Sequence, residues 1–90
     1  MKREKTKPIG LDDLRNEAFV VGAKQLKKAV KAGRARIVFL AENADPAVTE
    51  PLETLCGDNH IPITWVGRME DLGRACGIEV GAAAAAVLDP

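Results

Sequence analysis

The sequence predicts an α/β sandwich with a mostly parallel sheet. Apolar runs of strand length at 19–21, 36–41 and 61–66 alternate along the chain with segments of helical spacing, a pattern typical of parallel strands joined by helices. Hydrophobic residues make up 47% of the 90 residues, yet the chain has only two Phe, one Trp and no Tyr. We therefore expect one small domain with an aliphatic, alanine-rich core, and a platform that stacks many bases on aromatic rings is disfavoured.

The segment before residue 19 predicts a basic arm and a short helix. Residues 1–8 hold four Lys and Arg against one Glu and end at Pro8, so we expect a flexible arm there and a single domain over 9–90. A short helix follows in "GLDDLRNEA", whose acids lie in the first turn, as helix starts prefer. Its apolar face consists of Leu11, Leu14 and Ala18.

The run "FVV" at 19–21 predicts a strand, and the segment after Gly22 predicts an amphipathic helix over 23–32 that Gly33 closes. The apolar stripe of this helix consists of Leu26, Ala29 and Val30. Its other side is crowded by lysines, at Lys24, Lys27, Lys28 and Lys31.

These lysines stand where the helix dipole is positive. Each exposed cation there costs about 0.3–1 kcal/mol, and each like-charged pair four residues apart costs about 0.2–0.5 kcal/mol. A polyanion bound along this face would remove the penalty. Lysine is also a good helix former, so ordinary solvated side chains are the alternative.

Two buried strands and a helix are predicted in the middle of the chain. The strands are "RIVFLA" at 36–41 and "IPITWV" at 61–66, and both are rich in β-branched or aromatic residues. Between them we expect a helix that begins at Pro46 with Asp45 as its cap. The apolar positions of this helix are Val48, Leu52, Leu55 and Cys56.

The last quarter of the chain predicts a short helix and a final strand. The apolar positions of the helix are Met69, Leu72, Ala75 and Cys76, and Gly77 ends it. The segment "IEVGAAAAAVL" is ambiguous, because alanine favours helices while the length of the segment suits a strand. Alanines in a central strand would let the covering helices approach closely, and central strands are buried on both faces. We therefore expect a strand.

The net charge is zero, but the charges are unevenly distributed. Residues 1–36 hold eleven Lys and Arg against four Asp and Glu, whereas residues 37–90 hold two against nine. A basic face of this kind is the electrostatic footprint of a nucleic-acid or other anionic partner. The alternative is that the two halves attract each other across the fold, which needs no ligand.

The cysteines and the single histidine give little support for an enzyme. Cys56 and Cys76 lie in apolar helical patterns without metal-ligand spacing, so we expect buried, reduced thiols, a cytoplasmic protein, and neither metal nor cofactor. A redox pair of these cysteines, or His60 with Asp58 as a base, would need catalytic geometry that the sequence does not identify. The N-terminal segment lacks the apolar stretch of a signal peptide, and no apolar run approaches the roughly 20 residues of a membrane span.

Four segments resemble the kink-turn RNA-binding ribosomal proteins of the L7Ae type, particularly the small bacterial members. The resemblance extends from about Val20 to Leu88 and is carried by "VGAKQLKKAVKAG", "AENADP", "LCGDNHIPITWV" and "LGRACGIEVGAAAAAVL". The order and spacing of the four segments make the signal specific. It implies a three-layer α/β/α sandwich with a four-stranded mixed sheet, in which the last strand, the alanine run, is antiparallel to the others.

The resemblance also implies an RNA site at the start of the lysine-rich helix. Family members have a Gly-Thr-Asn-Glu run there, with a Lys three residues on, which meets the tandem sheared G·A pairs of a kink-turn. The matching residues are Gly22, Ala23, Lys24, Gln25 and Lys28. Bacterial relatives share the Lys-Gln pair, whereas Ala23 lacks the hydroxyl group of Thr.

A second RNA contact is implied in the segment formed by Ile78, Glu79 and Val80, a loop whose apolar side chains would cover bases at the bulge. Taken alone, Ile78 and Val80 look like ordinary strand core. Further candidate RNA contacts are Lys27, Lys31, Asp45, Thr49 and Arg68. Asp45 and Thr49 match family positions that hold an extruded base, and Arg68 lies near the place of a family lysine.

The sequence therefore predicts a non-enzymatic protein that recognises kink-turn RNA, ribosomal or regulatory, and works as a ribosome-associated monomer without contact to membranes. The alternative is a protein–protein adaptor that retains the fold without binding RNA. The basic first half disfavours an adaptor, which would not need cations at Lys24 and Lys28.

Overall fold

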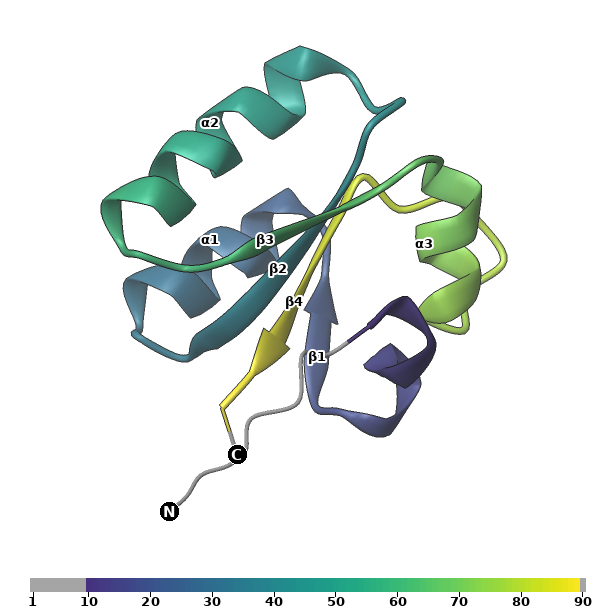
Figure 1. Cartoon of the computed structure of the whole chain (residues 1–90), viewed down its shortest axis with the longest axis horizontal. Helices are drawn as coiled ribbons and strands as arrows, with labels where there is room; N and C mark the ends of the chain where they lie inside the picture. The colour runs from purple at the N-terminus through teal and green to yellow at the C-terminus, as the bar shows by residue number, and fades with distance from the viewer. Residues whose placement is uncertain (1–9, 90) are drawn as a thin grey trace.

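A four-stranded mixed sheet forms the middle of the molecule (Figure 1). The computed structural model describes residues 10–89, so the arm predicted at 1–8 and the two ends of the domain predicted at 9–90 lie outside the described residues. The strands are β1 (Phe19–Val21), β2 (Ala35–Ala41), β3 (Ile63–Val66) and β4 (Ala84–Leu88), in the order β1-β4-β2-β3. β4 is antiparallel to both of its neighbours, and β2 is parallel to β3. The prediction of a mixed sheet with an antiparallel last strand is confirmed.

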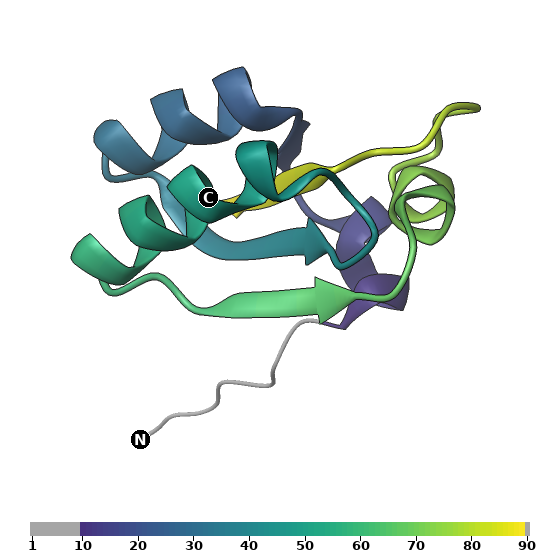
Figure 2. The same cartoon turned by 90° about the horizontal axis from the view of Figure 1, so that it is seen from above.

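Helices cover both faces of this sheet (Figure 1 and Figure 2). α1 (Ala23–Lys31) and α2 (Pro46–Asp58) pack on one face, whereas α3 (Met69–Ala75) and a 3-10 helix, η1 (Leu11–Asn16), pack on the other. The result is the predicted three-layer α/β/α sandwich. No helix in the described part of the chain combines the length and the apolar character that crossing a membrane requires.

The two inner strands contribute side chains to both cores. In β2, Val38 packs with α1 and α2, whereas its neighbour Phe39 packs with η1 and α3. β4 alternates in the same way, because Ala84 and Ala86 lie on the side of α1 and α2 and Ala85 lies on the other side. All three alanines are fully buried. β4 is therefore a thin central strand that lets helices pack closely on both faces.

The predicted start of α2 is confirmed in detail. The helix begins at Pro46, and the carboxylate of Asp45 accepts a hydrogen bond from the N–H of Ala47 at 2.9 Å. This bond satisfies one of the first-turn N–H groups that a helix leaves unpaired. Val48 was predicted to be part of the apolar face of α2, but its side chain is exposed.

Two other predicted elements differ from the structure. The short helix after Gly10 is a 3-10 helix that ends at Asn16, so Ala18 lies beyond it and is exposed, although Leu14 is buried as expected. A 3-10 helix has three residues per turn, so the α-helical spacing that placed Ala18 on the apolar face does not apply. The strand predicted at 61–66 begins only at Ile63.

The tight packing over β4 predicts that this strand tolerates no larger side chain. Ala86→Leu should lower the free energy of unfolding by about 1–3 kcal/mol, because the added methylene groups must displace α1 or α2. Urea denaturation measures this change. Ala47→Leu is the matched control, since Ala47 is exposed, and its effect should stay within about 0.5 kcal/mol. Equal effects of the two substitutions would contradict close packing at β4.

Candidate nucleic-acid interface

The start of α1 is an open helix N-terminus. Gly22 joins β1 to α1 with a φ of 101°, a conformation that favours glycine, and its N–H donates to the carbonyl oxygen of Ala84 at 2.9 Å. No side chain of residues 10–89 caps the helix, so the first-turn N–H groups are open to a ligand. A side chain at Gly22 would meet no atom within 4 Å, so access to these groups is unobstructed. Ala23 is half-buried against the core and offers its backbone N–H.

Exposed polar side chains surround this helix start. Lys24, Gln25 and Lys28 are all exposed. They lie on the face of α1 opposite its buried apolar stripe, which packs against the sheet. The remaining lysines of the helix, Lys27 and Lys31, are exposed as well. The first turn contains no acidic residue. The cations and the amide of Gln25 are thus presented to solvent beside the free N–H groups.

The loop between α3 and β4 exposes two apolar side chains. Ile78 is 37% exposed and Val80 is 70% exposed, and Glu79 between them is also exposed. β4 begins only at Ala84, so the interpretation of Ile78 and Val80 as strand core is wrong. Large apolar side chains exposed together on a loop are typical of a binding surface.

The backbone of α3 holds this loop in shape. The N–H of Ile78 donates to the carbonyl of Gly73, and the N–H of Ala82 donates to the carbonyl of Met69, both at 3.0 Å. Gly73 is buried, and a Cβ there would collide with the carbonyl oxygen of Val80. A Cβ at Gly81 would lie 3.1 Å from the Cβ of Met69. The loop can therefore lie this close to α3 because Gly73 lacks a side chain, whereas a side chain at Gly81 would require a small shift of Met69.

The sheet brings the loop and the start of α1 to the same end of the strands, where β1 ends and β4 begins. The N–H of Gly22 bonds to the carbonyl of Ala84, and the N–H of Ala41, at the end of β2, bonds to the carbonyl of Ala83, both at 2.9 Å. The loop therefore enters β4 directly beside Gly22. Figure 1 shows this meeting point, where the yellow chain passes from α3 into β4 next to the beginning of α1. The two surfaces that the sequence predicts as RNA contacts are neighbours in the fold.

Comparisons with known proteins match this arrangement to one family. The model of the ribosomal protein L7Ae/L30e/S12e/Gadd45 family matches residues 12–90. The chain belongs to this family. RNA-binding protein YbxF of Geobacillus stearothermophilus is 44% identical over 70 residues, which cover 78% of this chain and 85% of the relative. An RNA-binding protein of Bacillus pumilus is 40% identical over 72 residues, which cover 80% of this chain and 88% of the relative.

Solved structures agree with this assignment to the L7Ae/L30e/S12e/Gadd45 family. The Giardia lamblia 15.5kD RNA binding protein superposes with a TM-score of 0.83 at 29% identity, covering 89% of this chain and 71% of that protein. A protein of unknown function from Bacillus halodurans superposes with a TM-score of 0.79 at 31% identity, covering 88% and 83% of the two chains. The resemblance predicted from the sequence segments is confirmed, and so is the prediction that this is not an enzyme.

Three further candidate contacts of this L7Ae-family chain have side chains that the fold itself pairs or buries. The Asp45 carboxylate caps α2, as described above, and the side chain of Thr49 is only 5% exposed. Both residues therefore serve the fold of α2, and Thr49 has little surface left to offer a ligand. Arg68 is exposed, but its guanidinium lies 3.9 Å from the carboxylates of Glu70 and of Asp71, which partly offset its charge.

Three site-supporting residues were missed by the sequence reasoning: Asn43, Gly73 in α3 and Gly81 in the loop. The side-chain oxygen of Asn43 accepts a hydrogen bond from the N–H of Met69 at 2.8 Å, so it holds the start of α3, against which the loop packs. Close by, the Glu70 carboxylate has a lowered pKa, chiefly because of a hydrogen bond from its own backbone N–H. Gly73 could have been noticed, because a glycine inside a helical pattern usually has a packing reason.

Among the described residues, the ion pairs do not join the two oppositely charged halves. Within residues 10–89, Arg36 pairs with Glu17 at 3.5 Å, and Arg74 pairs with Asp71 at 3.6 Å. Each pair joins partners from the same half of the chain, and none in this described part involves a lysine of α1. Attraction between the halves through direct ion pairs therefore does not explain the lysine cluster.

The geometry also separates the two cysteines of the chain. Cys56 lies in the core beside α1 and α2, whereas Cys76 lies in the core on the other face of the sheet, so the two cannot form a redox pair. Burial raises the pKa of both thiols, which keeps them protonated and unreactive at neutral pH. No group of three or more potential ligands among the described residues is placed to hold a metal ion.

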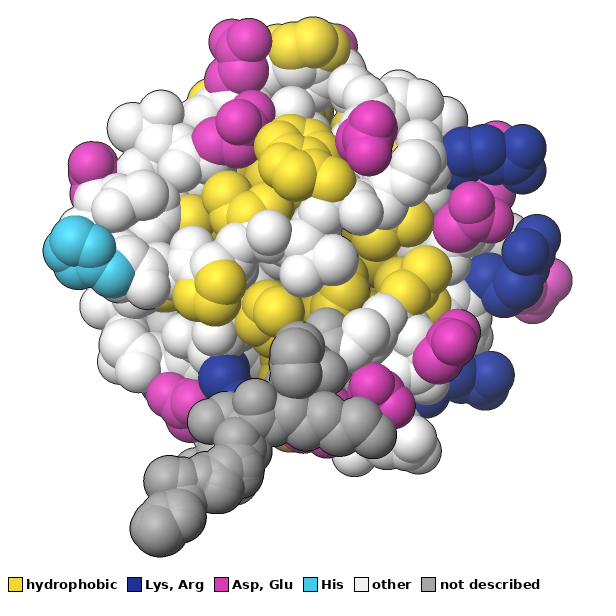
Figure 3. Space-filling view, in the orientation of Figure 1, with side chains coloured by type: hydrophobic (Ala, Val, Ile, Leu, Met, Phe, Trp, Pro, Cys, Tyr) yellow, Lys and Arg dark blue, Asp and Glu magenta, His cyan; other side chains and the backbone are white. Residues whose placement is uncertain are grey.

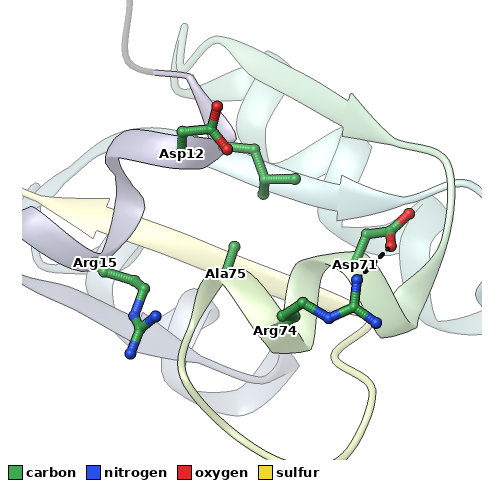
Figure 4. A pocket seen from close by; sticks show the side chains of 6 residues that line it. Asp12, Arg15, Asp71, Arg74 and Ala75 are labelled. Atoms are coloured by element: carbon green, nitrogen blue, oxygen red, sulfur yellow. Dashed lines mark ion pairs between the residues drawn. The ribbon is translucent and has the colours of Figure 1, made fainter.

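A hollow of about 410 Å³ lies between η1 and α3, on the face of the sheet opposite α1 (Figure 4). Its charged side chains come from both helices and alternate in sign: Asp12, Arg15, Asp71 and Arg74. The ion pair between Arg74 and Asp71 crosses its rim. The hollow lies outside the surface formed by α1 and the loop, and we assign it no ligand.

The contact between α3 and the loop predicts that Gly73 is essential for stability. Gly73→Ala should lower the free energy of unfolding by about 1–2 kcal/mol, because displacing the Val80 carbonyl costs about 1–3 kcal/mol while alanine improves the helix by only about 0.5–1 kcal/mol. Urea denaturation measures the change. Gly57→Ala in α2 is the matched control, since no atom lies within 4 Å of a Cβ there, and it should stabilise the protein. A stabilising effect at both positions would contradict this account of the loop.

Proposed function

We propose that the protein binds RNA and recognises kink-turns, and that it works in a ribonucleoprotein such as the ribosome. The observation that carries the proposal is the uncapped start of α1, open at Gly22 and flanked by Lys24, Gln25 and Lys28. Relatives at 40–44% identity are named as RNA-binding proteins, and the same helix start is the family position that meets the tandem G·A pairs.

The chemistry of α1 suits this RNA. Sheared G·A pairs expose base edges that the deep groove of an ordinary A-form helix hides from side chains. The Lys24 and Lys28 ammonium groups can donate to guanine O6 or N7, and the amide of Gln25 can both donate and accept at one base edge. Gly22 has no side chain to keep the RNA away from the free N–H groups of the first turn. These groups together read base edges and attract phosphates.

The loop supplies a different kind of contact. Ile78 and Val80 are aliphatic and exposed, so they can cover bases at the bulge of the kink-turn and remove apolar surface from water on both sides. Backbone groups around Glu79 can bond to the same nucleotides. Because α3 holds the loop beside α1, both contacts are in place before RNA arrives. The protein then stabilises the bent form of the RNA by population shift.

A gel-shift comparison tests the proposal directly. Kink-turn RNA and a straight duplex of the same length are titrated with the protein at moderate ionic strength. Binding to the kink-turn should be at least about tenfold tighter, because the duplex offers phosphates but no accessible G·A edges. Equal binding to both RNAs would contradict kink-turn recognition and would mean that the lysines bind phosphates without specificity.

Lys28→Ala should weaken binding of every RNA and reduce the slope of log affinity against log salt by about one unit, since one phosphate contact is lost. Fluorescence anisotropy over a salt series measures both effects. Arg36→Ala is a suitable control, because Arg36 lies at the other end of the sheet and pairs with Glu17. An unchanged slope for Lys28→Ala would show that this lysine does not reach the RNA backbone.

Gln25→Ala should cost about 1–3 kcal/mol of binding free energy and relax discrimination against altered G·A pairs, because its amide reads a base edge. The measurement compares the variant and the native protein on the kink-turn and on an RNA with the G·A pairs replaced. The native protein should lose far more affinity on the replaced RNA than the variant does. If the variant loses the same factor on both RNAs, Gln25 has no role in recognition.

A further inference from the structure

The order of the strands separates the charges of the molecule in space. Residues 18–36, which include β1 and α1, hold six Lys and Arg and no acid, whereas residues 37–67 hold five acids and no Lys or Arg. The second segment includes most of β2 and all of α2 and β3. β1 and β3 are the two outer strands of the sheet. One edge of the sheet therefore lies in a basic region, and the opposite edge lies in an acidic one.

Within the described part of the chain, the outer edge of β3 presents backbone groups that no other strand pairs. N–H groups of β2 and of the residue after it donate to the carbonyls of Pro62 at 3.0 Å and Val66 at 2.7 Å. Alternate residues of a strand turn their backbone groups to the same side, so Ile63 and Trp65 turn theirs away from β2. Within residues 10–89, no strand pairs with that side. A proline can block strand pairing at a sheet edge, but Pro62 does not block it here, because its backbone faces β2 and not the open side.

The same edge carries a large apolar side chain. The Trp65 residue is 41% exposed. Tryptophan is one of the residues that proteins most often use as an interface anchor, so this exposure favours a binding surface. Figure 3 shows the face that β3 crosses in Figure 1, where hydrophobic side chains form a central patch. Acidic side chains border this patch, and most of the visible Lys and Arg side chains lie at the right margin of the view.

We infer that the outer edge of β3 is a docking site for an extended, Lys- and Arg-rich segment of another protein. The segment would add a fifth strand, bonded to the backbone of Ile63 and Trp65, with an apolar side chain on the indole and cations beside the acids. The inference does not depend on RNA binding, because it concerns the edge of the sheet opposite β1.

The charge distribution selects this partner among the alternatives. RNA is excluded at this edge by repulsion between phosphates and five carboxylates in a segment without Lys or Arg. A second copy of the chain, paired through its own β3, would bring two such acidic regions together. A basic segment gains from the same acids, and charge complementarity of this kind selects partners and speeds their association.

Hydrogen exchange on the free protein gives the first test. The amides of Ile63 and Trp65 should exchange much faster than the amide of Val66, because only Val66 turns its backbone toward β2. Slow exchange at Ile63 and Trp65 would mean that this edge is already covered, by the chain itself or by a second copy, and would overturn the inference.

A titration with designed peptides gives the second test. The probe is a short peptide of alternating Lys and Val, with alternating Glu and Val as the charge control and alternating Lys and Pro as a control that cannot form a strand. Trp65 is the only tryptophan of the chain, so its fluorescence reports docking, and NMR shifts should centre on Ile63 and Trp65. Binding of all three peptides, binding of none, or shifts centred on α1 would each overturn the inference.

Substitutions at Trp65 separate this site from the RNA site. Trp65→Thr should weaken binding of the Lys-Val peptide by at least about tenfold, as loss of an interface anchor does, and Trp65→Phe should restore most of the affinity. Shifts of the NMR amide signals report binding by both variants. Affinity for kink-turn RNA should stay unchanged in both. Loss of RNA binding together with peptide binding would place Trp65 in the RNA interface instead, and full peptide binding by Trp65→Thr would remove the proposed anchor.

Discussion

The position of β4 between β1 and β2 is the constraint on which the rest of the structure depends. Its antiparallel pairing on both sides puts the carbonyl of Ala84 within 2.9 Å of the N–H of Gly22, and this bond fixes where α1 begins. The same strand receives the loop that carries Ile78 and Val80. Alanine is the side chain that makes the arrangement compact, because a central strand with larger residues would push the covering helices outward. Both parts of the proposed interface therefore depend on one thin strand.

Local chemistry made much of the fold predictable. Asp45 with Pro46, and Gly33 after the lysine-rich segment, mark helix ends that the structure confirms within a residue. The residues alone favoured a mostly parallel sheet, because alternating strands and helices carry no sign that the last strand reverses. Only the family resemblance predicted that the last strand is antiparallel. The exposure of Ile78 and Val80 was hidden for a related reason, since two β-branched residues before an alanine run have the same pattern whether they lie in the strand or before it.

The parts of the candidate site that depend on residue type could be predicted from the sequence. The parts that depend on contacts with the backbone of a distant segment could not. The cations of α1 and the missing cap at Gly22 can be read from the sequence, and the structure places these residues at the surface. The role of Gly73 is different, because it arises from the approach of a helix backbone to the carbonyl of Val80 across a turn. A glycine inside a helical pattern indicates that something packs closely there, but no spacing rule identifies the Val80 carbonyl as the partner. Asn43, whose side chain reaches a residue 26 positions further on, was obscure for the same reason.

The charge separation across the sheet has a consequence for motion in solution. A protein with no net charge feels little overall pull toward a polyanion, but one with cations on one side and carboxylates on the other carries a permanent electric dipole moment. In the field of a nucleic acid this dipole experiences a torque, which turns the α1 side forward while the two molecules are still separated by solvent. Collisions in the reverse orientation are repelled. Productive encounters are thereby enriched before the first hydrogen bond forms, and added salt shortens the range over which this alignment acts.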